Sequence, residues 1–398
     1  MSDSILIIGG GLAAQRAGET LRRAGHDGPV TIVCAEPHRP YDRPPLSKEV
    51  LTGHNEPEQV FFRAPDWYRD EDLELVTGTA ATRLHRSERR VELEDGSELA
   101  YDKLLIATGS RPRTLPAFER FENVSVLRTL DDSLQLNEAL RGASRIVVIG
   151  AGFIGQEVAA GARKLGVEVT MVEAAPSILG HMLGEQVGGW FADLHRSHGV
   201  DVVLGHQVQD VVGNGHVQAL SLSDGSTVEV DHVVVGIGVA PDTEWLLGTG
   251  LIGIGLAGGA PAGVEVGDAG RTLDANIFAA GDAAATYDPV LGRHMPGSHW
   301  EAAARQGARA ARAMLGLDPG IAPVSSFWTD QYGLRVQYLG RAPLADETAI
   351  DGSPEERDFT VIYRRAGRPV AALLVNRPGA LPEVRRLLET GSELALSA

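Results

Sequence analysis

The sequence comprises 398 residues, of which 43% are hydrophobic and 22% are charged, and its formal net charge is −17. That length exceeds what one ordinary hydrophobic core needs, so we expect two or three domains. The acidic balance argues against a nucleic-acid-binding protein, because binding phosphates requires a positive surface.

The amino-terminal stretch SILIIGGGLAAQRAGETLRRAG…VTIVCAE predicts a strand, a glycine turn, a helix and a second strand. Gly9, Gly11 and Ala14 match the pattern G-x-G-x-x-[GA], and Glu36 ends the second strand. Glycines let the backbone approach a pyrophosphate at the helix N-terminus, where unpaired N–H groups favour negative charge. The carboxylate then accepts hydrogen bonds from a ribose, so the stretch predicts a dinucleotide site. No basic residues precede the first strand, so we expect no signal peptide and a cytoplasmic protein.

Two features lie in or just after the second strand. Cys34 is the single cysteine of the chain, which excludes an intramolecular disulfide and favours a buried structural thiol. The motif RPYDRPPLSK follows and ends on Lys48, one of only three lysines beside 33 arginines. Its prolines fix φ and disfavour helix before them, so we expect a stiff, extended segment that holds this lysine.

The next two stretches predict a further strand and a second glycine motif. YDKLLIATGS predicts an apolar strand that ends in Thr108 and Gly109, where the chain can cross between domains. The pattern SRIVVIGAGFIGQEVAAGARKLGVEVTMVEAA then repeats the strand, turn, helix, strand and acidic residue. Its glycines are Gly150, Gly152 and Gly155, and its carboxylate is Glu173. Two complete motifs in one chain predict two bound dinucleotides.

The identity of the two dinucleotides follows from the residues around them. A carboxylate at Glu173 repels a 2′-phosphate, and the following Ala174 and Ala175 offer no arginine to receive one, which favours NADH over NADPH at the second site. A nicotinamide cofactor beside a second dinucleotide suggests FAD. The later strand ANIFAAGDAA ends in Gly-Asp, and its Asp282 is placed to hydrogen-bond a ribityl hydroxyl.

The ordered motifs resemble those of FAD-dependent NADH:ferredoxin reductases of the putidaredoxin reductase and biphenyl-dioxygenase ferredoxin reductase type, in the pyridine nucleotide-disulfide oxidoreductase superfamily. The resemblance rests on GGGLAA, YDRPPLSKEVL, LLIATGSRPR, VLRTLDD, VVIGAGFIGQEVA, VVVGIGVAPDTEWL, FAAGDAA and FWTDQY, and it covers essentially the whole chain. It implies an α/β fold with two Rossmann-like domains, glutathione-reductase-like, plus a small C-terminal α+β domain. The implied boundaries are 1–111 and 243–318 for FAD, 112–242 for NAD, and 319–398 for the domain facing the flavin and the partner.

The resemblance also implies residue roles. It places FAD at Ala13, Glu36, Arg43, Lys48, Ala81, Arg128, Asp282 and Trp300, with Trp328 packing by the isoalloxazine. It places NAD at Ile154, Glu157, Glu173 and Gly238. Lys48 then lies near the reactive edge of the flavin and pairs with Glu157 at the nicotinamide end. We hypothesise that the two residues together favour hydride arrival, because a compact ammonium neutralises charge on the reduced flavin where a guanidinium needs more room.

The implied activity is that of a ferredoxin–NAD(+) reductase. Electrons pass from NADH through FAD, one at a time, to a [2Fe–2S] ferredoxin or similar carrier that serves a Rieske oxygenase or cytochrome P450. Candidates for the docking surface are Arg309, Arg312, Arg335, Arg377, Arg385 and Arg386. We expect a monomer or homodimer with no membrane partner.

Two departures and two alternatives accompany this interpretation. Relatives usually carry Arg-x-Glu where this chain has Pro296, Gly297 and Ser298, and often Pro plus an aromatic residue where it has Ser325 and Ser326. These changes leave the partner's identity open. An NADH oxidase is one alternative, although relatives of that kind carry a flavin-proximal cysteine. An NADH-sensing flavoprotein resembling apoptosis-inducing factor is the other.

Histidines give little sign of a metal site. Only His195 and His198 have helical ligand spacing, and no carboxylate or cysteine partner is evident beside them, so we expect no metal.

Overall fold

A computed structural model describes residues 2–253, 263–288, 292–297, 299–321 and 324–390. The chain divides into two compact units, and both are discontinuous in sequence. The first unit contains Met1–Asp42, Glu58–Arg111 and Val239–Pro323. The second contains Arg43–Pro57, Pro112–Gly238 and Val324–Ala398.

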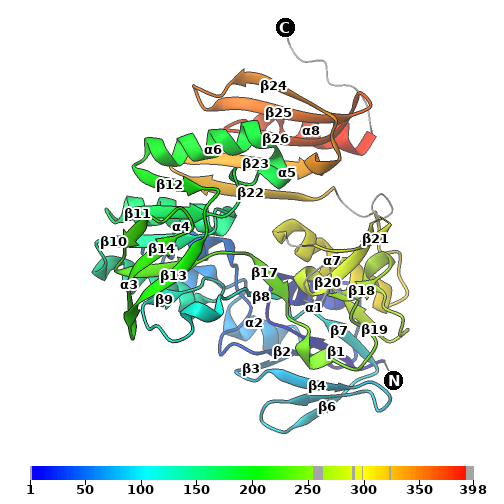
Figure 1. Ribbon diagram of the computed structural model, residues 1–398. Helices are drawn as coiled ribbons and strands as arrows, with labels where there is room; N and C mark the ends of the chain where they lie inside the picture. Colours follow the sequence, from blue (N-terminus) through cyan, green and yellow to red (C-terminus); the bar gives the residue numbers. More distant parts are fainter. Residues whose placement is uncertain (1, 254–262, 289–291, 298, 322–323, 391–398) are drawn as a thin grey trace. The chain divides into compact units, whose positions relative to one another are not determined.

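The first unit is built on a five-stranded parallel sheet (Figure 1). In spatial order its strands are β19 (Ile277–Ala279), β7 (Lys103–Ile106), β1 (Ile5–Ile8), β2 (Val30–Cys34) and β3 (Leu73–Thr77). The central strand ILII is buried along its whole length, as expected for a parallel sheet covered on both faces.

Helices and smaller sheets complete this unit. The helices are α1 (Leu12–Arg23), α2 (Pro65–Asp70) and α7 (Trp300–Met314). One antiparallel sheet contains β4 (Ala81–His85), β5 (Arg90–Leu93) and β6 (Glu98–Ala100); another sheet contains β18 (Val264–Val266), β20 (Ala284–Asp288) and β21 (Arg293–Pro296). The chain leaves and re-enters this unit near the short strands β8 (Ser110–Pro112) and β17 (Val239–Pro241). Helix α1 packs directly on α7, because Gly307 has no Cβ to strike the Ala13 carbonyl.

The second unit repeats the parallel sheet and adds an antiparallel one. The parallel strands, in spatial order, are β12 (Val200–Leu204), β11 (Glu168–Glu173), β10 (Arg145–Ile149), β16 (His232–Val235) and β9 (Val124–Ser125). Its helices are α3 (Leu130–Gly142), α4 (Phe153–Lys164), α5 (Gly180–Leu183) and α6 (Glu185–Ser197). A side sheet contains β13 (Val208–Asn214), β14 (His216–Leu222) and β15 (Thr227–Glu229).

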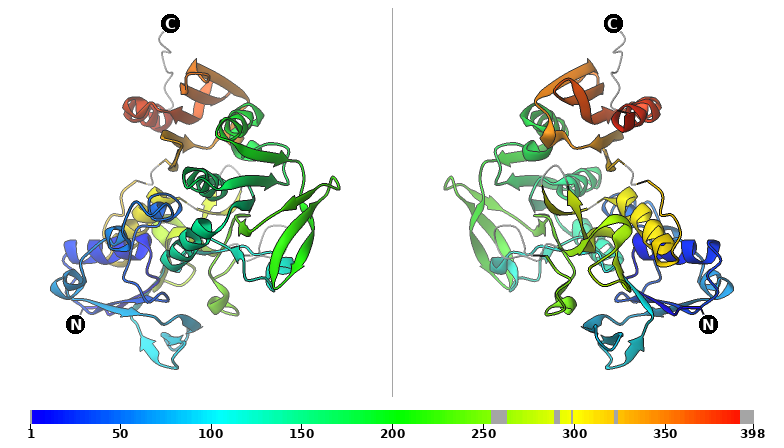
Figure 2. Two further views of the ribbon diagram at one scale, coloured as in Figure 1. Left: turned by 90° about the vertical axis from the view of Figure 1, so that its left-hand side faces the viewer. Right: turned by 90° about the vertical axis from the view of Figure 1, so that its right-hand side faces the viewer.

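The C-terminal part of this unit is a five-stranded antiparallel sheet with one helix. Its strands, in spatial order, are β22 (Ser326–Gln331), β23 (Leu334–Gly340), β26 (Arg368–Val375), β25 (Asp358–Arg365) and β24 (Glu347–Ser353), followed by α8 (Leu381–Thr390). Figure 2 shows α6 in green beside the orange strands, and Trp190 of α6 meets Phe359 edge to face at 5.1 Å. One hydrophobic core runs from the parallel sheet through Phe191 to Val361 and Leu373, so the C-terminal sheet is fixed to the elements around α4.

The fold class predicted from sequence is confirmed: two parallel α/β sheets, each opening on a glycine turn, precede a small C-terminal α+β region. None of the helices in the described part of the chain has the length and apolar character needed to cross a membrane.

Candidate functional site

The first glycine turn leaves the start of α1 open. Gly9 has φ of +131°, and a Cβ there would lie 2.1 Å from the carbonyl oxygen of Ala107, so only glycine fits. Gly11 is the N-cap of α1; within the described residues no side chain caps it and no atom lies within 4 Å of where its Cβ would be. Free N–H groups at an uncapped, unobstructed helix start fit the pyrophosphate of a dinucleotide.

Cys34 of β2 packs against the first glycine turn. Gly10 lies over Cys34, whose sulfur would be 2.7 Å from a Cβ at that position. Cys34 is buried, so the prediction of a structural thiol is confirmed. Glu36 follows the strand, and its carboxylate accepts a hydrogen bond of 2.5 Å from the Tyr41 hydroxyl.

The other predicted FAD residues of the first unit lie at the ends of strands or in the first turns of helices. Asp282 follows β19 and accepts a 2.8 Å hydrogen bond from the Ser110 hydroxyl. Thr108 follows β7 and donates its hydroxyl to the Asp242 carbonyl, at 2.6 Å, while Gly109 accepts from the Asp242 N–H.

Trp300 opens α7 and donates its indole N–H to Asp42 at 2.5 Å. Ala13 lies in the first turn of α1, and Ala81 begins β4.

The second glycine turn has the same geometry at the start of α4. Gly150 has φ of +98°, and a Cβ there would lie 2.4 Å from the Gly236 carbonyl oxygen. A Cβ on Gly155 would strike the Gly150 carbonyl oxygen at 2.1 Å, which is why a third glycine is needed here. The N-cap Gly152 lacks a side-chain cap among the described residues. The residues therefore fit a second dinucleotide as well.

The acidic residue of this motif is oriented by the backbone. Glu173 accepts hydrogen bonds of 2.8 Å from the N–H of Ala151 and from the N–H of Ala175. The carboxylate is thereby held beside the glycine turn. Ile154 is 45% exposed at the start of α4, and Gly238, with φ of +97°, follows β16.

Lys48 and Glu157, predicted from the resemblance to form a pair, are brought together within the second unit. The Lys48 ammonium lies 2.8 Å from the Glu157 carboxylate, and both side chains are largely buried, at 11% and 3% exposed. The ammonium also donates to the Pro44 carbonyl at 3.1 Å. Two partners thus hold the lysine at a defined position.

The expectation of an extended PPLSK segment is wrong. Pro44–Ser47 forms a 3₁₀ helix, and Arg43 before it has helical angles (φ −85°, ψ −30°). Proline is tolerated in the first turn of a helix, since the N–H that it lacks has no partner there. The turn brings Lys48 and the Pro44 carbonyl to the same side.

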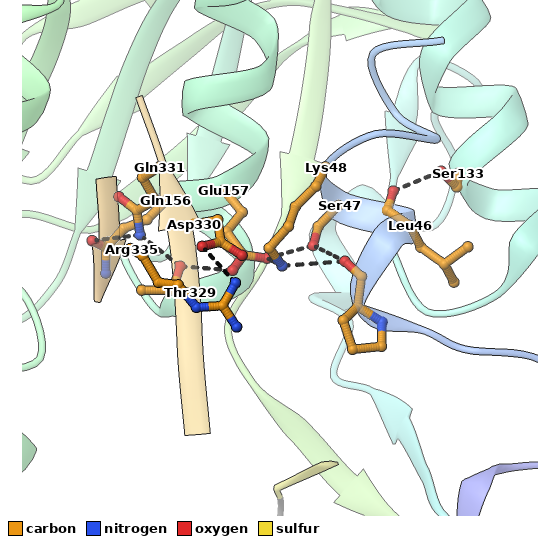
Figure 3. A network of polar contacts seen from close by, with 11 residues as sticks. Leu46, Ser47, Lys48, Ser133, Gln156, Glu157, Thr329, Asp330, Gln331 and Arg335 are labelled. Carbon is orange, nitrogen blue, oxygen red and sulfur yellow. Dashed lines mark hydrogen bonds and ion pairs between the residues drawn. The ribbon is translucent and has the colours of Figure 1, made fainter. Parts of the chain in front are cut away.

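Glu157 has two further partners that the sequence did not reveal. Ser47 donates its hydroxyl to one carboxylate oxygen, and Thr329 of β22 donates to the other at 2.6 Å (Figure 3). These contacts join residues separated by 110 and 172 positions in the chain. The only signal in the sequence was that both residues lie within motifs that carry the resemblance, YDRPPLSKEVL and FWTDQY.

The remaining FAD candidates of the second unit are Arg43, Arg128 and Trp328. Arg43 donates to the Arg128 carbonyl at 2.7 Å, and the Arg128 N–H is held by Asp132. Trp328 lies on β22 with the Arg335 guanidinium 5.7 Å from its ring centroid. The predicted FAD residues are therefore shared between both units.

Several arginines proposed for docking are already paired within the chain. Arg309 contacts Asp268 at 2.7 Å and is 14% exposed, whereas Arg377 contacts both Asp351 and Asp358. Arg335 contacts Asp330, Arg312 donates to the Asp318 carbonyl, and Arg385 and Arg386 lie on α8.

The sequence departures and the histidines can also be located. Pro296 ends β21, Gly297 follows it, and Ser298 lies outside the described residues. Ser325 precedes β22, and Ser326 is buried at its start. His195 of α6 is fully buried and contacts the Tyr332 hydroxyl at 2.8 Å, while His198 stacks on the Tyr332 ring. A search of the described residues finds no cluster of three metal-ligating side chains.

Comparison with known proteins connects this geometry to a family. Residues 3–307 match the family described as pyridine nucleotide-disulphide oxidoreductase, and residues 326–398 match the family described as reductase C-terminal. The chain is 38% identical, over 98% of its length and 95% of the relative's, to the ferredoxin–NAD(+) reductase component of the anthranilate 1,2-dioxygenase system of Burkholderia cepacia.

Solved structures show the same likeness. The reductase in the covalent putidaredoxin reductase–putidaredoxin complex is 32% identical with a TM-score of 0.92, and the match covers 97% of this chain and 93% of that one. The ferredoxin reductase for the CYP199A2 system of Rhodopseudomonas palustris is 32% identical with a TM-score of 0.90, covering 99% and 98%.

Proposed function

Because the chain belongs to the pyridine nucleotide-disulphide oxidoreductase family, we propose that it is an NADH-dependent reductase of a [2Fe–2S] ferredoxin. Family membership makes it an oxidoreductase with FAD and a pyridine nucleotide as cofactors, as predicted. The observation that carries the proposal is the single, buried cysteine: with no redox-active cysteine pair, electrons must leave to an external acceptor. The relatives named as ferredoxin reductases indicate which acceptor.

The proposed division of labour follows the two glycine turns. FAD occupies residues 1–111 and 243–318, NADH occupies residues 112–242, and residues 319–398 face the flavin and the partner. When bound, FAD accepts a hydride from NADH and passes electrons on singly. The open start of α1 and of α4 each bind a pyrophosphate, and Glu36 and Glu173 each bind a ribose.

Lys48 and Glu157 orient the reacting rings and balance charge. The Lys48 ammonium neutralises negative charge that develops when the hydride arrives. Because the ammonium is largely buried, this electrostatic effect is stronger than it would be in water. The Glu157 carboxylate fixes the ammonium and would lie at the nicotinamide end of bound NADH. Both residues act only if the two pyrophosphate sites direct the rings toward them.

NADH is the proposed donor rather than NADPH. The Glu173 carboxylate is fixed by the N–H groups of Ala151 and Ala175, so it cannot swing away to admit a 2′-phosphate without losing two hydrogen bonds. A cytoplasmic location follows from the proposed donor and the proposed partner.

The partner is a ferredoxin that serves a Rieske oxygenase or a cytochrome P450. The candidates for contact with its acidic surface are Arg312, Arg335, Arg385 and Arg386. Arg309 and Arg377 are weaker candidates, because the Arg309 side chain is only 14% exposed and Arg377 contacts two carboxylates of the chain.

Reduction of cytochrome c by NADH, with and without added [2Fe–2S] ferredoxin, tests the proposal. We expect the rate to depend on ferredoxin and to fall as ionic strength rises. A rate that is independent of ferredoxin at every ionic strength would refute it, and peroxide formation in its place would identify an oxidase.

A further inference from the structure

The Glu157 carboxylate receives three donors from two separate segments of the second unit. One oxygen accepts from Lys48 and Ser47, which follow one another in the chain, and the other accepts from Thr329 of β22 (Figure 3). Glu157 is 4% exposed and Thr329 fully buried, so water does not replace a lost donor freely. The Thr329 hydroxyl is therefore needed to satisfy that second oxygen.

The proton of the Thr329 hydroxyl is directed toward Glu157 by its own neighbours. A hydroxyl has one proton to donate. The Gln331 amide N–H donates to the Thr329 oxygen at 3.1 Å, so that oxygen acts as acceptor toward Gln331 and as donor toward Glu157, at 2.6 Å. Gln331 also donates to the Gln156 carbonyl oxygen at 3.4 Å.

The orientation of Gln156 is fixed in turn. Its amide N–H₂ donates to the Ala151 carbonyl at 3.0 Å, which turns its oxygen toward Gln331 and toward His195 Nε2 at 3.4 Å. Burial lowers the pKa of His195 to about 4, so the ring is neutral and carries one proton. Since the Gln156 oxygen accepts, that proton lies on Nε2, and Nδ1 accepts from the Tyr332 hydroxyl at 2.8 Å.

We propose that Thr329 is a positioning residue of the hydride-transfer step, and that Gln331 orients it. In this inference, which rests on the proposed function, Thr329 holds the Glu157 carboxylate in the rotamer that keeps Lys48 in place. Two donor routes result: one runs from Tyr332 through His195 and ends at the Gln156 oxygen, which also accepts from Gln331. The other runs from Gln331 through Thr329 to Glu157. As a consequence, the C-terminal sheet completes the pair, because β22 supplies the third donor, Thr329.

An isosteric substitution of Thr329 removes the hydroxyl and keeps the volume of the side chain. In Thr329→Val we expect anaerobic reduction of bound flavin by NADH, followed by stopped flow, to slow about tenfold, since one hydrogen bond to a buried charge is lost. Thr329→Ser restores the donor and should return the rate to within about twofold of the original. Thr360→Val is the matched control: Thr360 is a buried threonine of the same sheet, on β25, and its variant should reduce at the original rate.

The position of Lys48 provides a measurement that does not depend on turnover. The chain has three lysines, so ¹³C-lysine labelling gives three ε-methylene resonances, and Lys48→Arg identifies the one of interest. We expect Thr329→Val to shift the Lys48 resonance, Thr329→Ser to restore it and Thr360→Val to leave it unchanged. Should Thr329→Val not fold, Gln331→Leu tests the same route, with a smaller slowing of about threefold and the same direction of shift.

An unchanged Lys48 resonance together with an unchanged reduction rate in Thr329→Val, or in Gln331→Leu where that replaces it, overturns the inference. Failure of the original protein to reduce its flavin with NADH is a separate result, which rejects the proposed function. In that case a Lys48 resonance that still moves in Thr329→Val supports the positioning contact alone, and one that does not move rejects it.

Discussion

The two glycine turns share one geometry but differ in how their helices are covered. In both, the first glycine has positive φ and sits against a carbonyl, and the second leaves the helix start open. In the first turn of α1 the Ala13 side chain is buried and packs against α7 and Gly281, whereas the equivalent Ile154 of α4 is 45% exposed. A covered turn suits a cofactor that stays bound, and an exposed turn suits a substrate that exchanges at each cycle.

The residues after each turn show where the repeat diverges. Gln15 and Gln156 occupy equivalent positions and both are fully buried. Gln15 bonds Tyr68 and Glu19, and the next residue, Arg16, is partly exposed on the outside of the unit. Gln156 bonds His195 and Gln331, and the next residue is Glu157 of the buried pair. The two helices therefore differ at this position: α1 carries an arginine paired within its own helix, and α4 carries the glutamate of the buried pair.

Matched valine substitutions at the two open glycines have the largest expected effect. Gly11 and Gly152 both have negative φ and space for a side chain, so Gly11→Val and Gly152→Val should fold but block the approach of a pyrophosphate. We expect Gly11→Val to lose flavin absorbance and to bind FAD at least about tenfold more weakly. Gly152→Val should stay yellow and show KM for NADH raised by at least about tenfold. Loss of flavin from Gly152→Val alone would reverse the assignment of the two turns.

Removal of the Lys48 side chain tests the proposed role of the Lys48–Glu157 pair. Lys48→Ala should retain FAD and slow flavin reduction by NADH about 100-fold, because an oriented charge at the reacting rings is lost. Stopped-flow absorbance under anaerobic conditions gives the rate. Lys103→Ala is a control, since this lysine pairs with Asp3 in the first unit; an unchanged rate in Lys48→Ala would count against the proposed role.

Exchange of the second acidic residue sharpens the contrast between the two ribose sites. The double variant Glu173→Ser, Ala174→Arg removes the repelling carboxylate and supplies a guanidinium for a 2′-phosphate. We expect the ratio of kcat/KM for NADPH over NADH to rise about tenfold or more. At the first site, Glu36→Ser should leave this ratio unchanged and weaken the binding of FAD instead.

His195 of α6 predicts that the stability of the fold changes with pH in the acidic range and not near pH 7. Burial lowers the pKa of His195 from 6.5 to about 4, so below pH 6.5 the unfolded chain takes up a proton that the folded chain does not. Stability from this group is complete above pH 6.5 and is lost as pH falls toward 4, by about 3 kcal/mol. In His195→Gln the fall in the free energy of unfolding between these pH values should be smaller by that amount, as measured with denaturant. The exposed His216→Gln should not change it.

Local patterns in the sequence predicted the parts of the site that are continuous in the chain. Both glycine turns, both acidic residues and the strands around them follow from spacing, because a strand, a tight turn and a helix leave few choices of residue. The Lys48–Glu157 pair came from the resemblance, and its roles remain to be measured. Ser47 and Thr329 were missed, since nothing local tells which distant hydroxyl meets a buried carboxylate.

Two further features depended on tertiary structure. The prolines of PPLSK were interpreted as extended, but contacts of Leu46 and Lys48 with the turn favoured a 3₁₀ helix, in which proline fits the first positions. The docking arginines were predicted without their partners, and the structure shows that Arg309 and Arg377 are paired with nearby carboxylates. Ion pairs between distant segments have no periodic signal in a sequence.

A single-turnover experiment tests the central claim most directly, namely that two nucleotide sites in this chain supply electrons to an external one-electron acceptor. The yellow protein is bleached anaerobically with one equivalent of NADH and then mixed with excess oxidised [2Fe–2S] ferredoxin. We expect flavin colour to return while two ferredoxin molecules are reduced per flavin. Flavin that never bleaches, or that stays bleached in the presence of ferredoxin, would contradict it.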